Sequence, residues 1–99
     1  MRVFLIQQKQ LEEVSSQGRI KRVSIQRMDH KKWLPLFEII QGEQTITASL
    51  RVQSREEART WADLRLLADW LREGFGITRC ELLLGEFKTS HEGKNENET

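Results

Sequence analysis

The chain has 99 residues, of which 37% are hydrophobic and 31% charged, and its formal net charge at pH 7 is +1. A chain of this size and composition predicts one small soluble domain, and no apolar run approaches the roughly 20 residues that cross a bilayer, which excludes a membrane role. The single cysteine, Cys80, excludes an internal disulfide, so we expect a reducing, cytoplasmic location.

The first forty residues predict a strand, a short helix and a hairpin. Residues 1–6 form a short β run, and residues 9–17 have helical spacing that ends at Gly18, a residue type that tolerates the left-handed conformation. Residues 19–27 and 33–40 then predict two strands joined by a polar turn. Because Pro35 cannot donate to a β ladder, we expect its strand to lie at a sheet edge or to enter the sheet through a bulge.

The middle of the chain predicts one further strand and the main helix. Residues 45–53 alternate between apolar and polar side chains, which is typical of a strand with one wet face. Two residues could begin the helix: Ser54 opens a capping-box spacing, and Asp63 could cap a helix that starts at Leu64. We favour Asp63, because the apolar stripe begins only there.

The last part of the chain predicts a helix stop, a strand and a tail. The glycines at 74 and 76 end the helix, and residues 77–84 form a final strand in which the alternation points Cys80 into the core. Residues 1–87 then make a single α+β domain with a mainly antiparallel sheet, the order β-α-β-β-β-α-β and both helices on one face. Residues 88–99 are polar, and we expect a mobile tail.

Chemistry-bearing residues are sparse. His30 and His91 lack a second imidazole or thiolate at a ligand-like spacing, so no metal site is predicted. The carboxylates occupy helix surfaces or caps and come without a partner group for acid or base work. We therefore expect no catalytic residue, no cofactor and no small-molecule substrate.

A cluster of basic residues is the strongest binding signal. Between residues 18 and 32 a single acid, Asp29, accompanies several cations, and Trp33 follows at once. Cations on one surface contact phosphates, and an exposed aromatic side chain can stack on a base. Strand alternation, however, divides the cluster between two faces. The predicted nucleic-acid-binding residues are Arg19, Lys21, Arg22, Arg27, Lys31 and Lys32.

Two apolar side chains of the main helix predict a protein contact. Leu66 and Trp70 widen the apolar stripe beyond what one sheet contact needs, so they either close a small core or meet a partner. A homodimer through this helix margin, or through the expected edge strand near Pro35, is the corresponding hypothesis.

The order of several short motifs resembles a known family. Gly18-Arg19-Ile20, Arg59-Thr60-Trp61 and Trp70-Leu71-Arg72, followed by residues 76–81, resemble the small ParC-type partition-associated proteins of conjugative plasmids and related mobile elements. The resemblance covers residues 1 to about 85. It departs from the family pattern at residues 53–57, where the family usually has an Arg-Gly-rich turn.

The resemblance implies a non-enzymatic accessory protein of a plasmid or other mobile element, acting in partition or maintenance through DNA or a DNA-bound protein. A second hypothesis is an inhibitor that binds a host defence protein, as anti-CRISPR proteins do. The two hypotheses differ in the charge of the surface that binds the partner. A DNA accessory protein uses the basic residues, and a nucleic-acid mimic uses the acidic stretch 56–73.

Overall fold

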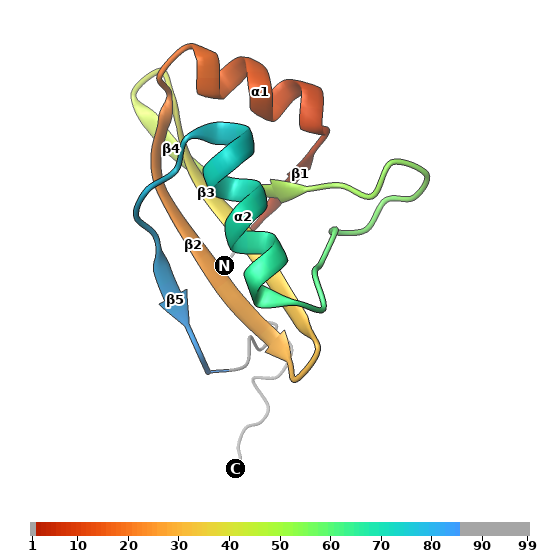
Figure 1. Ribbon diagram of the computed structural model, residues 1–99. Coiled ribbons are helices and arrows are strands. Elements are labelled where there is room, and N and C mark those ends of the chain that lie inside the picture. Colours follow the sequence, from red (N-terminus) through yellow and green to blue (C-terminus); the bar gives the residue numbers. More distant parts are fainter. Residues whose placement is uncertain (1, 86–99) are drawn as a thin grey trace.

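The elements of the chain follow one another in the predicted order along residues 2–85, the part that the computed structural model describes (Figure 1). The expected tail, residues 88–99, lies outside the described residues. The elements are β1 (Phe4–Ile6), α1 (Gln8–Ser16), β2 (Ile20–Asp29), β3 (Lys32–Gln41), β4 (Gln44–Leu50), α2 (Leu64–Phe75) and β5 (Glu81–Leu83). The predicted α+β class is confirmed.

The five strands form one mixed sheet in the order β1-β4-β3-β2-β5. The central strands β2, β3 and β4 pair antiparallel, whereas β1 runs parallel to β4 and β5 runs parallel to β2. Val23 pairs with Phe37, which pairs in turn with Ala48, so these three side chains share one face of the sheet. The sheet is mainly antiparallel at its centre, as expected.

Both helices cover this same face of the sheet (Figure 1). The core consists of buried side chains from the two helices and the three central strands: Leu11, Val23, Ile25, Phe37, Ile39, Ala48, Leu50, Leu67 and Leu71. Side chains of α1 and α2 therefore pack into one common core, which confirms the prediction that both helices lie on the same face of the sheet.

Local signals set the bounds of α2. The Asp63 carboxylate accepts a hydrogen bond from the Arg65 backbone N–H at 2.9 Å, which caps the first turn. At the other end Gly76 adopts a left-handed conformation, with φ of 67°, which favours glycine because the residue has no Cβ. The start at Leu64 confirms the expectation from Asp63 over the one from Ser54.

Of the two alternatives for Pro35, the sheet edge was wrong, because β3 is the central strand of the sheet. A register shift of the β2–β3 ladder does lie close by, between Arg27 and Asp29, opposite Trp33 and Lys32. The position of Pro35 is tolerated because the β3–β4 ladder stops at the pair of Phe37 and Ala48, before it reaches the proline. The Pro35 carbonyl instead accepts a hydrogen bond from the buried Ser49 hydroxyl at 2.5 Å. A proline without a donor therefore occupies a position where no ladder bond to β4 is required, and no dimer edge exists at this residue.

The chain between β4 and α2 doubles back on itself and then rejoins β3. Arg51 pairs with Ala58 in an isolated bridge, and Gln53 to Glu57 lie exposed between them. Trp61 then exchanges two backbone hydrogen bonds with Trp33, of 2.8 and 2.9 Å. The connection projects to one side of the domain, as Figure 1 shows in green.

Candidate nucleic-acid interface

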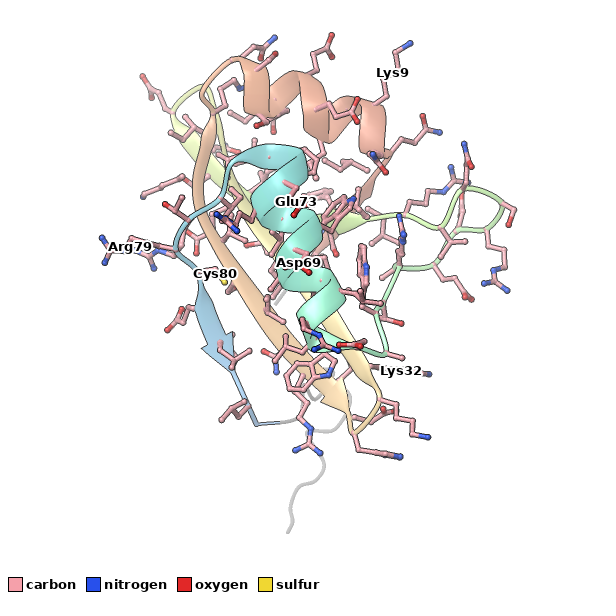
Figure 2. All side chains as sticks on the ribbon, viewed as in Figure 1. Lys9, Lys32, Asp69, Glu73, Arg79 and Cys80 are labelled. Carbon is pink, nitrogen blue, oxygen red and sulfur yellow. The ribbon has the colours of Figure 1, made fainter. Side chains whose placement is uncertain are left out.

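The predicted basic cluster is spread along the whole of β2. Arg19, Lys21 and Arg22 lie at its start, whereas Lys31 and Lys32 lie at the hairpin that joins it to β3. The strand has 10 residues, and at about 3.3 Å per residue its two ends are roughly 30 Å apart. Figure 2 shows Lys32 at the hairpin end, far from the start of the strand. The six cations do not form one surface.

The two faces of β2 divide the cluster further. Arg22 pairs with Glu38 in the register, and their side chains approach to 4.0 Å on the face away from the helices. Arg27 pairs with Trp33, whose side chain packs against the core, so Arg27 belongs to the helix-covered face. Arg22 and Arg27 therefore lie on opposite faces, as the alternation predicted, whereas a register shift between Ile20 and Arg22 interrupts the alternation at Lys21.

Arg19 is engaged with its own surroundings. Its Nε donates to the Ile40 carbonyl at 2.9 Å, and a terminal nitrogen donates to the Gln17 side chain at 2.7 Å. These bonds fasten the turn between α1 and β2 to the end of β3. Arg19 therefore offers fewer free donors to an external phosphate than an unengaged arginine does.

Lys21 and Arg22 meet a cation that the sequence interpretation missed. Arg79 precedes β5, and the parallel pairing of Ser24 with Glu81 brings it beside the start of β2. The three cations line an open hollow of about 490 Å³, called here the β2–β5 hollow. Its lining also includes Val23, Cys80 and Glu81. Figure 2 shows Arg79 projecting from the outer edge of the sheet.

Cys80 is exposed, so the expectation that it packs in the core was wrong. The ladder of β5 begins only at Glu81, and residues before it lie outside the sheet, so strand alternation does not direct Cys80 inward. Partial burial of the thiol against its neighbours nevertheless raises its pKa. The thiol is therefore largely protonated at neutral pH and is a weak nucleophile.

The two residues predicted to form a protein contact, Leu66 and Trp70, have different surroundings in the structure. Trp70 turns inward, with its ring centroid 5.0 Å from that of Trp61 and 4.9 Å from that of Phe75. Leu66 points outward and is 58% exposed. Trp70 therefore helps to close the core, and Leu66 alone remains at the surface.

The outer side of α2 carries both signs of charge. Figure 2 shows Asp69 and Glu73 on its solvent side, and Arg65 and Arg72 are exposed on the same helix. The acids of the stretch 56–73 are thus interleaved with arginines, and Glu57 is paired with Arg55 at 3.3 Å. This arrangement gives little of the continuous negative potential that a nucleic-acid mimic needs.

Residues 2–85 contain no group of three or more His, Cys, Asp or Glu side chains that could hold a metal ion. In the same residues, neither helix has the length and apolar character needed to cross a membrane.

Comparison of the chain with protein-family models, with curated proteins and with solved structures gave no match in any of the three. The ParC-type resemblance stays a prediction from the sequence. The candidate site therefore depends on the geometry of the residues themselves.

Proposed function

We propose that this protein is a non-enzymatic accessory factor that contacts the phosphate backbone of DNA through the β2–β5 hollow. The observation that carries the proposal is the convergence of Lys21, Arg22 and Arg79, from two segments distant in sequence, with Glu81 as the acid among them. Cations on an open surface suit phosphates, which lie along the outside of a duplex.

The weak ion pair between Arg22 and Glu38 leaves Arg22 able to bind a phosphate in place of the carboxylate. Its contact with Glu38 is long, at 4.0 Å, and the two side chains are 62% and 36% exposed. Exposed pairs of this kind contribute about 0–1 kcal/mol. A phosphate can therefore replace the carboxylate at little cost.

The small number of cations in the β2–β5 hollow limits the affinity and the sequence specificity of its contact with DNA. Three cations neutralise few phosphates, and the net charge of the chain is only +1, so binding to DNA alone is weak and has the modest salt dependence of about three phosphate contacts. Phosphate contacts orient a protein on a duplex without reading sequence. We therefore propose an accessory role beside a DNA-bound partner, within the plasmid maintenance setting that the resemblance implies.

The experiment compares the two ends of β2. Fluorescence anisotropy with a labelled duplex is measured over a range of salt for the parent and for the triple variant Lys21→Gln, Arg22→Gln, Arg79→Gln. The matched control is Lys31→Gln with Lys32→Gln, which removes exposed cations at the hairpin end. We expect the triple variant to lose salt-sensitive binding, with the slope reduced by about 0.9 for each phosphate contact removed.

The control should bind as the parent does. Equal losses in both variants would show that charge at any position suffices, and an absence of binding by the parent at low salt would remove the proposal. A host protein that the parent retains after nuclease treatment, with no DNA binding at low salt, would favour the inhibitor hypothesis instead.

A further inference from the structure

The outer edge of β5 is an open pairing surface. β5 pairs with β2 along one side only, and among residues 2–85 no strand pairs with its other side. The N–H and C=O groups that point away from β2 therefore have no ladder partner in this part of the chain. Leu82 and Leu84 are 44% and 60% exposed, and Figure 1 shows β5 at the margin of the domain. Such an edge is a template for a further strand.

The chain just before β5 continues this edge. Residues 76–80 contain neither a turn nor a bend, and Arg79, Cys80 and Glu81 are all exposed. Arg79 and Glu81 are two positions apart in an extended stretch, so their side chains point to the same face, and both line the β2–β5 hollow. Cys80 lies between them and also lines a space beside α2. The edge therefore carries a cation and an anion on either side of a central cysteine.

This order of charges is self-complementary. When two copies of the segment run antiparallel about a twofold axis at Cys80, Arg79 of each copy lies opposite Glu81 of the partner subunit. An axis at residue 79 or at residue 81 would instead place two like charges directly opposite each other, which is destabilising. An axis between two residues would oppose side chains that point to different faces. The charges therefore favour one register, and in it the partner that fits the edge is a second copy of the chain.

We propose that two copies of this chain pair antiparallel through residues 78–82, across a twofold axis at Cys80, and so join their β2–β5 hollows into one basic surface. The inference rests on the proposed function, because the joined hollows are its DNA contact. With about 4.8 Å between neighbouring strands, the two β2 strands lie roughly 15 Å apart, and each copy adds its own Lys21 and Arg22 to the surface. The paired segment is short, so association without DNA is weak and depends on concentration.

Cys80 reports on this pairing directly, because it is the single cysteine of the chain. Cβ atoms of directly opposed residues lie about 4.5–5.5 Å apart, within reach of a short bismaleimide, and every cross-linked dimer must join Cys80 to Cys80 of the partner subunit. The folded protein is treated with the reagent over a range of concentrations without DNA, and its mass is followed by sedimentation velocity. We expect a weak dimer that becomes covalent at Cys80.

Charge reversal tests the register. Arg79→Glu and Glu81→Arg each place like charges opposite one another, so each variant alone should give about tenfold less dimer. An equal mixture of the two variants restores opposite charges across the axis and should recover the dimer. The double variant that carries both changes should recover it too. Lys31→Glu, at the exposed hairpin end of β2, is the matched control and should cross-link as the parent does. Thermal melting establishes that each variant is folded.

The joined surface is tested on a labelled duplex over a range of salt. The purified cross-linked dimer should show a slope of log affinity against log salt about twice that of Cys80→Ser, which cannot be cross-linked, because twice as many phosphates are neutralised. Equal slopes would overturn the joining of the hollows. The pairing is overturned if the parent gives no cross-link at millimolar concentration or if mixing the two variants restores nothing. Cross-linking and rescue without any DNA binding at low salt would remove the proposed function and leave the pairing in place.

Discussion

The two helices cover the same face of the sheet, but α2 buries more of its side chains against it than α1 does. α2 buries Leu67 and Leu71 and extends the core through the edge-to-face contact of the Trp70 and Phe75 rings. α1 buries Leu11, and its other residues are exposed or partly exposed. The strongly packed helix therefore secures the fold, while the lightly packed one contributes less to it.

The largest expected effect comes from placing a charge under α2. Leu67→Asp puts an unpaired carboxylate where the parent side chain is 0% exposed, and burying an unpartnered charge exceeds the stability margin of a small domain. We expect loss of the fold, measured by circular dichroism and thermal melting. Leu66→Asp, at an exposed position of the same helix, is the control and should melt like the parent.

Truncation of one buried leucine in each helix sharpens the comparison. Leu71→Ala and Leu11→Ala remove the same atoms at positions 2% and 0% exposed, and each should cost about 2–5 kcal/mol of unfolding free energy. The two variants should differ in which part of the domain they destabilise. We expect hydrogen exchange to accelerate throughout the core for Leu71→Ala but chiefly in α1 for Leu11→Ala. Identical exchange patterns would contradict the distinction between the helices.

A smaller effect is expected at the cap of α2. Asp63→Ala removes the acceptor of the Arg65 backbone N–H and should cost about 1 kcal/mol. Asp63→Asn is the matched variant, because asparagine caps as well as aspartate, and it should retain most of the stability. Chemical denaturation measures both, and an equal loss in the two would assign the effect to charge and not to the cap.

The smallest effect concerns the reactivity of Cys80, which lines a space beside Leu71. Because burial raises the pKa of the thiol, the folded protein holds less thiolate than the unfolded chain at a given pH. Alkylation should therefore be slower in the folded state, and its rate should rise as the pH passes the raised pKa. Leu71→Ala should accelerate it and Leu11→Ala should not. Equal alkylation rates for folded and unfolded protein would contradict the first expectation.

Features encoded by neighbouring residues could be predicted from the sequence. Asp63 and Gly76 mark the ends of α2 by direct contact with its own first and last turns. The alternation of residues 45–53 likewise predicts the strand β4, Gln44–Leu50. Such signals need no knowledge of distant partners.

Features that depend on long-range pairing could not be predicted in this way. The central position of Pro35 follows from the strand order, and the exposure of Cys80 follows from the late start of β5. Arg79 joins Lys21 and Arg22 only because β5 pairs with β2. The basic residues of the candidate site were therefore identified in part, whereas their grouping depends on contacts between segments far apart in sequence.

The parallel outer strands also have a consequence for the order in which the domain folds. β2, β3 and β4 are joined by short turns, whereas β1 and β5 reach their partners only across long stretches of chain. Closing long loops is slow, so the central meander is expected to form early and the two outer strands to attach late. The β2–β5 hollow borders one of those late-forming strands, because Glu81 of β5 lines it. Mutations there should leave the folding rate nearly unchanged and act mainly on unfolding.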